Sequence, residues 1–487
     1  MKRIFITFIS ALIIIGCNNK NIVITVELPD QPEVDTLTYF VPISGISYWG
    51  FADTLKRNET GKFELKMKIT QPSFITVWST DAKIKDRAYF GVKLLVEPGG
   101  NYHVSMDSLK NVQITGTNEK VQMLYATLPD PFYVELETDK WLYNNDTVPF
   151  PVVHQQINDL KQTELSNFKA LLDNREIFDL IQKDRDCYYA QLEVLLLFSK
   201  SDERYKLRFK NEDGLLEYME EIYNQYPIND ESFLISSFWF EYADFYITNY
   251  KPFIQGNFDS QDLLAAGMLN THYINESKKY LSGKALEYFQ ARYIVCLFLE
   301  YGKREKEFIS LFEQFEKDYP TSEYSKYLKP LIDELTEYHR ISEQPFDPAV
   351  LFMDSYETIN TFAEAIKPFR GKKVYIDVWA QWCGPCKTEF AHKEALKKIL
   401  AENDIELLYI SIDNDSNDQR WKNAIKYYNL TGLHIRANRE LARNLGILYP
   451  YNPAFAIPWY ILVDENGNIM EEYAKRPSQL VAGEKLW

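Results

Sequence analysis

Short runs in which apolar and polar residues alternate fill the first part of this chain of 487 residues. The runs at 22–26 and 63–69 have the period of two that is typical of half-buried β-strands. Groups rich in Gly, Pro and Asn, such as those at 58–61 and 98–101, separate the runs and indicate turns. We therefore predict a β-rich domain over residues 17–118.

From about residue 119 the spacing of the apolar residues changes to that of helices. The segment 308–320 has a clear amphipathic period, and the segment 190–198 is a dense apolar run that suits a buried helix. The helical segments are not alike enough to establish a regular repeat. They predict an irregular helical bundle over residues 119–345.

Strand-like and helical runs alternate in the last part of the chain, after a proline-containing linker. Apolar runs typical of buried strands occupy 374–379, 407–413 and 460–464, and a helical run separates the second from the third. Alternation of this kind predicts a central sheet flanked by helices. We therefore expect an α/β domain over residues 346–487, and a multidomain chain, as its length allows.

The composition is that of a folded, soluble protein, with 46% hydrophobic and 25% charged residues. Aromatic residues make up 15% of the chain, which we interpret as core packing rather than as a glycan-binding surface. The formal net charge of −16 repels the phosphate backbone of nucleic acids. We therefore expect no nucleic-acid partner.

The chemistry of the chain is indicated by the run WCGPCK at residues 382–387, which stands between a predicted strand and a predicted helix. This order places Cys383 at the N-terminus of the helix, where backbone N–H groups and the helix dipole favour a thiolate. We expect Cys383 to be an exposed nucleophile. Cys386, one turn further along, would attack the mixed disulfide that Cys383 forms. The pattern therefore predicts thiol–disulfide exchange.

A Cys-x-x-Cys pair can also be half of a zinc site, which needs a second pair of ligands at suitable spacing. The chain has six His, and Cys187 and Cys296 are isolated, so the sequence offers no second pair. We expect no metal and no cofactor other than the redox-active pair Cys383 and Cys386. Cys187 and Cys296 fall in predicted helices, as buried thiols or as partners in a disulfide.

The run IDVWAQWCGPCK at 376–387 resembles the thioredoxin superfamily, and KTEF at 387–390 is similar to its TlpA/ResA-like branch of membrane-anchored extracytoplasmic reductases. The resemblance covers about the last 140 residues, a length that suits one domain. It implies a C-terminal thioredoxin fold that reduces protein disulfides. The runs at 96–104 and 114–118 resemble the small β-sandwich often found ahead of thioredoxin modules in Bacteroidetes lipoproteins, which implies an architecture and no activity.

The resemblance also implies functions for single residues near the cysteines. Asp377 matches a buried carboxylate that passes a proton to and from Cys386. Glu389 matches an acidic position of the cytochrome c maturation branch, although an ordinary residue on a helix surface would look the same. The tail after Pro477 is short, so we expect the last helix of the family to be shortened or atypical.

A second set of residues is expected to bind the substrate: Trp382, Gly384, Pro385, Ile457 and Pro458. Trp382 is expected to shield the cysteine pair. Ile457-Pro458 matches the cis-proline of the family, which faces the cysteines. The backbone of Ile457 would there bind an extended peptide.

The N-terminus predicts where the protein works. Two basic residues precede the apolar run 4–15 and Gly16-Cys17, which resembles a bacterial lipobox. This run is too short to span a bilayer, which takes about 20 residues. We expect a signal peptide over residues 1–16, a lipid on Cys17, and a protein anchored to the cell membrane or outer membrane that faces the periplasm. An ordinary secretory signal is the alternative.

These features together predict a membrane-anchored periplasmic thiol–disulfide oxidoreductase that reduces protein disulfides. Its partners would be those disulfides and a membrane protein that donates thiol electrons. One alternative is a tethered substrate- or partner-binding protein with an accessory redox domain. Another is a peroxidase of the peroxiredoxin type, which has Thr three residues before its cysteine, where this chain has Ala380 before Cys383.

Overall fold

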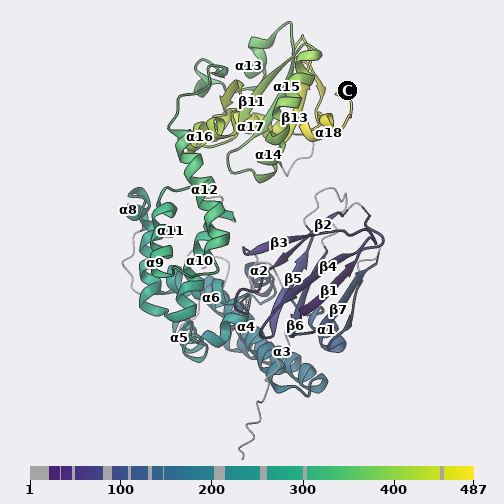
Figure 1. Ribbon diagram of the computed structural model, residues 1–487. Helices are drawn as coiled ribbons and strands as arrows, with labels where there is room; N and C mark the ends of the chain where they lie inside the picture. Colours follow the sequence, from purple (N-terminus) through teal and green to yellow (C-terminus); the bar gives the residue numbers. More distant parts are fainter. Residues whose placement is uncertain are drawn as a thin grey trace, which may run out of the picture. The chain divides into compact units, whose positions relative to one another are not determined.

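The computed structural model describes residues 21–32, 34–46, 50–79, 90–107, 111–129, 134–145, 147–201, 214–252, 260–299, 304–449 and 455–486. The chain divides into two compact units, Met1–Leu331 and Ile332–Trp487. The first contains strands followed by helices, and the second a sheet with helices (Figure 1). The predicted signal peptide and Cys17 lie outside the described residues. Among the described residues, no helix is both long and apolar enough to cross a membrane.

Strands β1 to β8 of the first unit form two four-stranded sheets, ordered β4-β1-β7-β8 and β3-β2-β5-β6. Their bounds are β1 Asn21–Glu27, β2 Thr36–Phe40, β3 Ala52–Lys56, β4 Phe63–Lys68, β5 Ser73–Trp78, β6 Gly91–Val96, β7 Asn101–Met106 and β8 Val112–Gly116. Ile22, Ile24 and Val26 alternate along β1 and are fully buried. They share one core with Leu37 of β2 and Ile75 of β5, in the other sheet. The two sheets therefore pack face to face as the predicted β-sandwich.

Helices follow the sandwich, as the sequence predicts. Their bounds are α1 Glu119–Tyr125, α2 Val134–Asn144, α3 Phe150–Leu171, α4 Arg175–Ser201, α5 Leu215–Gln225, α6 Trp239–Phe245, α8 Ser260–Ala265, α9 Leu269–Tyr280, α10 Gly283–Leu299, α11 Glu307–Asp318 and α12 Ser325–Ser342. The long helix α4 packs against α2, α3, α5 and α6 and contains the predicted apolar run. It is therefore the central helix of this bundle.

Cys187 on α4 and Cys296 on α10 are both buried, and neither belongs to a disulfide. Of the two alternatives that the sequence left open, the structure has buried thiols. Burial raises the pKa of the Cys187 thiol, so the reactive thiolate is disfavoured there. We therefore interpret Cys187 as a packing residue.

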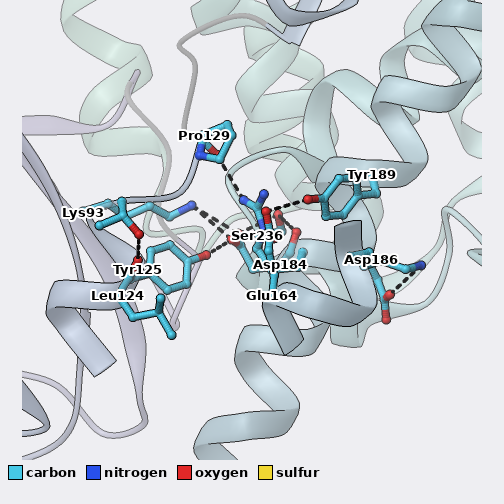
Figure 2. A network of polar contacts seen from close by, with 12 residues as sticks. Lys93, Leu124, Tyr125, Pro129, Glu164, Asp184, Asp186, Tyr189 and Ser236 are labelled. Carbon is cyan, nitrogen blue, oxygen red and sulfur yellow. Dashed lines mark hydrogen bonds and ion pairs between the residues drawn. The ribbon is translucent and has the colours of Figure 1, made fainter. Parts of the chain in front are cut away.

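A buried ion pair joins the sandwich to the helices (Figure 2). Nζ of Lys93 on β6 lies 3.2 Å from Oδ1 of Asp184 on α4, and both side chains are almost fully buried. Lys93 also donates a hydrogen bond to Ser237 Oγ at 3.1 Å. Asp184 accepts hydrogen bonds from Ser236 Oγ at 2.9 Å and from the Tyr125 hydroxyl. Both charges therefore have the additional partners that a buried pair needs in order to stabilise a fold.

A second polar cluster lies beside this pair and joins α4 to α3 (Figure 2). Arg185 Nε is 3.0 Å from Glu164 Oε2, and the Tyr189 hydroxyl donates to Glu164 Oε1 at 2.6 Å. Arg185 Nη1 also donates to the Pro129 carbonyl at 3.1 Å. The centre of the bundle is therefore held by charged residues as well as by apolar packing.

The second unit contains a six-stranded sheet in the order β14-β13-β10-β11-β12-β9. The strands are β9 Val350–Phe352, β10 Lys373–Trp379, β11 Ile405–Ser411, β12 Gly432–Arg436, β13 Trp459–Val463 and β14 Ile469–Glu471. The neighbours from β9 to β10 are parallel, whereas β13 is antiparallel to both β10 and β14. β10 is thus a central strand whose residues from Val374 on are buried.

Helices cover both faces of this sheet: α13 Phe362–Ile366, α14 Gly384–Glu389, α15 Lys393–Glu402, α16 Asp418–Tyr428, α17 Arg439–Leu448 and α18 Pro477–Val481. On one face, Ile376 and Val378 of β10 share a core with Trp421 of α16. On the other face, Tyr375 packs in a core with Leu396 of α15. This arrangement is the predicted α/β, thioredoxin-like region, with the expected short last helix α18.

Candidate active site

The chain passes from the central strand β10 into α14 at the predicted cysteine pair. Cys383 is the N-cap residue of α14, and Pro385 lies in its first turn, where a fixed φ and a missing N–H suit the start of a helix. The sulfurs of Cys383 and Cys386 form a disulfide, with their Cα atoms 5.3 Å apart. The structure therefore holds the oxidised form of the pair.

The start of α14 also provides a donor for Cys383. The backbone N–H of Cys386 donates a hydrogen bond to Cys383 Sγ at 3.1 Å. When the disulfide is reduced, this N–H and the helix dipole stabilise a negative charge on the same sulfur. The local geometry thus favours Cys383 as the thiolate.

The exposure predicted for Cys383 is not observed. In this oxidised form the residue is 4% exposed, and Cys386 is fully buried. The physical reason is that the Cys383 sulfur is turned toward the helix terminus, where it is bonded to Cys386 and accepts the hydrogen bond. Only a small part of Cys383 is therefore open to another molecule.

The predicted substrate-binding residues next to the pair are at the surface. Trp382 is 57% exposed, and Gly384 and Pro385 are exposed as well. A Cβ atom added at Gly384 would have no neighbour within 4 Å, so the surface beside the cysteines is open. The indole of Trp382 lies largely in solvent rather than shielding the pair, and it offers an apolar surface to an approaching peptide.

The Ile457–Pro458 peptide bond is cis, as the resemblance implies. It directly precedes β13, in which Trp459 is the antiparallel partner of Val378 on β10. This register brings Pro458 to the end of β10 that leads into the cysteine pair. Ile457 and Pro458 are both partly exposed, so their surface can be reached from solvent.

Asp377 lies on β10, inside the sheet. It is 2% exposed, and its Oδ1 atom has no hydrogen-bond partner among the described residues. Burial, and then the charge of Glu389, raise the pKa of Asp377 well above its usual range. A carboxyl group with a raised pKa binds a proton more readily than a free one, which is the property that the resemblance implies for the residue that exchanges a proton with Cys386.

Glu389, at the end of α14, is not the solvated surface residue that the sequence left as an alternative. It is 7% exposed and accepts two hydrogen bonds from α18. The Ser478 N–H donates to Oε2 at 2.9 Å, and the Ser478 hydroxyl donates to Oε1 at 3.0 Å. The short last helix therefore fixes a second buried carboxylate, whose charge acts on Asp377.

Asp413 is a site residue that the sequence analysis missed. It is 1% exposed and accepts hydrogen bonds from the Gln381 N–H at 2.9 Å and the Ser411 hydroxyl at 2.7 Å. It thereby holds the turn that leads to Cys383. The sequence could have indicated Asp413 by its position just after the strand that is β11. The carboxyl ends of neighbouring parallel strands meet at one edge of a sheet, so a residue there lies close to the end of β10.

We expect Asp377→Asn to slow resolution of the mixed disulfide by about 10²-fold near neutral pH, because the group that accepts the Cys386 proton is lost. Attack by Cys383, the first step, should keep its rate. Rapid-quench measurements of the two steps test this. If both Asp377→Asn and Glu389→Gln resolve at the normal rate, neither carboxylate is the base.

The same variant should also change how stability depends on pH. Because the folded-state pKa of Asp377 is raised, its contribution to stability is fully present below the unfolded pKa of about 3.9 and is lost as the pH rises toward the folded value. The Asp377→Asn variant should therefore have a larger free energy of unfolding than the wild type at pH 7. Near pH 3.5 the two free energies should differ little. Urea unfolding of the second unit at both pH values measures the difference.

The described residues include no group of three or more His, Cys, Asp or Glu side chains placed to hold a metal ion. Residues 348–480 match the protein family described as Redoxin. Thiol-disulfide oxidoreductase ResA of Bacillus thuringiensis subsp. konkukian is 29% identical over 108 residues, which are 22% of this chain and 57% of that protein. The chain thus spans little more than half the length of this relative.

Two further matches are similar in extent. Thioredoxin-like protein YneN of Bacillus subtilis is 28% identical over 120 residues, which are 24% of this chain and 65% of that protein. The solution structure of a candidate thiol–disulfide oxidoreductase from Bacteroides vulgatus shares 32% identity and covers 25% of this chain and 75% of that one, with a TM-score of 0.21. The sequence matches, rather than the TM-score, are the evidence for relationship.

Proposed function

Because residues 348–480 form a Redoxin domain homologous to thiol–disulfide oxidoreductases of the ResA and TlpA kind, we propose that the chain is a membrane-anchored, periplasm-facing oxidoreductase that reduces protein disulfides. The observation that supports this most is the Cys383–Cys386 disulfide at the start of α14. The buried carboxyl of Asp377, on the strand that leads into it, supplies the proton chemistry.

The reaction begins with the reduced pair. The Cys383 thiolate attacks one sulfur of a substrate disulfide, a new S–S bond forms, and the other substrate sulfur leaves as a thiolate. The Cys386 thiol then gives its proton to Asp377 and attacks Cys383 Sγ. The second substrate sulfur leaves, so two electrons have passed to the substrate and the Cys383–Cys386 disulfide remains.

A complete cycle needs a thiol donor that reduces this disulfide again. We propose a membrane protein that supplies thiol electrons, because the chain would be tethered to the same bilayer. Its thiolate would attack the Cys383–Cys386 disulfide and run the two steps in reverse. Asp377 would return the proton to Cys386.

The reducing direction is supported by the spacer between the cysteines. Gly384-Pro385 is the spacer of thioredoxin, whose potential of about −270 mV makes it a reductant. By this likeness the chain should donate electrons rather than form disulfides.

The test is insulin reduction by the chain from Asn21 to Trp487, with dithiothreitol as the electron source. We expect insulin to precipitate much faster than with dithiothreitol alone. The potential of the Cys383–Cys386 pair, measured by equilibration with glutathione, should lie below about −200 mV. A value near about −120 mV, that of a strong oxidant, would reverse the proposed direction.

The membrane anchor is a separate part of the proposal and rests on Gly16-Cys17. The mature protein should partition into detergent when it is expressed with its leader, because acyl chains on Cys17 bind to micelles. Cys17→Ala should remain in the aqueous phase. Mass spectrometry of the mature N-terminus decides the matter, since a cleaved chain without added lipid would contradict the anchor.

A further inference from the structure

The helical part of the first unit contains a cavity of about 400 Å³, which is in the size range of small-molecule sites. Helices α4, α6, α8, α9 and α10 supply most of its walls. Thr248 and Asn249 border it from the π-helix Tyr246–Tyr250, which follows α6. Short π-helical segments within helices are frequent at functional sites. The cavity is therefore a candidate binding site.

A buried polar side chain of the wall has no partner. Gln191 of α4 is 1% exposed, and its Oε1 atom accepts no hydrogen bond from the described residues. A buried acceptor without a donor is costly, and most such groups in folded proteins are satisfied. The terminal torsion of a glutamine is broad and nearly twofold, so the carboxamide can present either its oxygen or its NH2 group to the cavity. It suits a ligand that has a donor and an acceptor side by side.

Other polar groups of the wall already interact inside the protein. The Tyr293 hydroxyl donates a hydrogen bond to Asn270 Oδ1 at 3.2 Å. The side chains of Glu241, Asp244 and Glu305 interact with groups of the protein as well. These carboxylates therefore give no reason to expect a charged ligand, whereas Gln191 is a buried group that a ligand would satisfy.

Much of the remaining wall is apolar. The rings of Phe240, Phe245, Tyr273 and Tyr293 line the cavity, together with leucines of α4, α8, α9 and α10. Aromatic side chains pack well against another flat ring, in offset-stacked or edge-to-face contacts. A planar ligand would bury its ring against these side chains while its polar edge faces Gln191.

We propose that this cavity binds a small planar molecule in which an aromatic ring carries a carboxamide or lactam group. The N–H group of the ligand donates to Gln191 Oε1, and its carbonyl oxygen accepts from the Gln191 NH2 group. The ring packs against the aromatic side chains of α6, α9 and α10. The proposal does not depend on the disulfide chemistry, because the cavity belongs to the first unit and the cysteine pair to the second.

Titration calorimetry of the chain from Asn21 to Trp487 tests the proposal with three probes. Benzamide has the ring and the donor–acceptor edge. Acetophenone has a methyl group in place of the NH2 group, and isobutyramide has the amide without the ring. Benzamide should bind with a Kd of about 1 mM or tighter, and the other two should bind at least about tenfold more weakly. No saturable binding of benzamide, or equal binding of either other probe, overturns the proposal.

A variant locates the binding within the protein. Gln191→Leu should weaken benzamide binding by about tenfold or more and remove the preference for benzamide over acetophenone. Gln155→Leu, the same change at an exposed glutamine of α3 outside the cavity, should leave both unchanged. A folded Gln191→Leu variant that keeps the preference for benzamide also overturns the proposal.

The stability of the same variant separates a binding role from a structural one. Without ligand, Gln191→Leu should be at least as stable as the wild type, because an apolar side chain of similar size replaces a buried amide that has no partner. Hydrogen exchange of peptides from α4, measured in increasing urea, reports on this part of the chain. A less stable Gln191→Leu variant would mean that the amide serves the fold, and the proposal would then be wrong.

The polar group of the natural ligand is either a primary amide or a lactam, and a fourth probe distinguishes the two. In isoquinolin-1-one the N–H and C=O groups belong to a ring that is fused to the aromatic ring. Tighter binding of isoquinolin-1-one than of benzamide indicates a fused lactam, and the reverse order indicates a primary amide. Both results support the shared donor–acceptor edge.

Discussion

A Cys386→Ser variant is expected to accumulate a mixed disulfide with insulin and to lose all catalytic turnover. Cys383 keeps its place as the N-cap of α14, so it still attacks the substrate disulfide. A serine hydroxyl does not break an S–S bond by exchange, because this chemistry requires a thiolate. Non-reducing electrophoresis of the prereduced variant should therefore show one insulin chain bound per protein. The wild type should form such an adduct only transiently.

The opposite replacement identifies the nucleophile. Cys383→Ser should form no adduct and should reduce insulin no faster than dithiothreitol alone. The fully buried Cys386 has little surface with which to replace it. Cys187→Ala serves as a matched control, because burial raises the pKa of that thiol and it lies in the other unit. Adducts that form on Cys386 when Cys383 is absent would mean that the two assignments must be exchanged.

The trap also gives access to the natural substrates. A Cys386→Ser chain produced with its own leader would retain proteins whose disulfides Cys383 attacks. Peptide mapping of the adducts gives the substrate and the cysteine involved. The number of different adducts also shows whether the protein reduces many secreted proteins or one dedicated partner.

The sequence predicted the features that depend on local spacing. Alternation at 22–26 gave β1, in which Ile22, Ile24 and Val26 are buried. The run WCGPCK gave the helix start and the disulfide of Cys383 and Cys386, because a strand, two cysteines and a proline fix the backbone over a few residues.

Contacts between distant residues could not be predicted in this way. Glu389 accepts a hydrogen bond from Ser478, which is 89 residues further along the chain. The spacing of polar residues on a helix surface does not predict that contact. Asp413 reaches Gln381 across 32 residues, because β10 and β11 are parallel neighbours. The burial of Cys383 is likewise a product of the folded site rather than of its motif.

Lys93→Met is expected to destabilise the first unit by about 3–5 kcal/mol, because the buried carboxylate of Asp184 loses its counter-ion. The Nζ atom of Lys93 also lies over three aromatic rings, 4.7 Å from the ring centre of Phe74, 4.8 Å from that of Phe238 and 5.5 Å from that of Tyr125, so three cation–π contacts are lost. The chain has two units and need not unfold in one step. Hydrogen exchange of peptides from β6 and α4 (Figure 1), measured in increasing urea, reports on the first unit alone.

Two further variants separate the ion pair from the charge that its loss leaves behind. Lys66→Met removes a lysine whose side chain is 64% exposed beside Glu64, and it should cost no more than about 0.5 kcal/mol. Adding Asp184→Asn to Lys93→Met should recover a large part of the lost stability, because the buried charge without a counter-ion is then gone. In the double variant one of the two hydroxyls, of Ser236 or Tyr125, keeps the amide oxygen as its acceptor, and the oxygen of the other can accept from the new amide NH2 group. If Lys93→Met costs as little as Lys66→Met, the ion pair does not stabilise the junction between β6 and α4. Apolar packing and the hydrogen bonds between Gln122 and the Leu95 backbone then hold the sandwich to the helices.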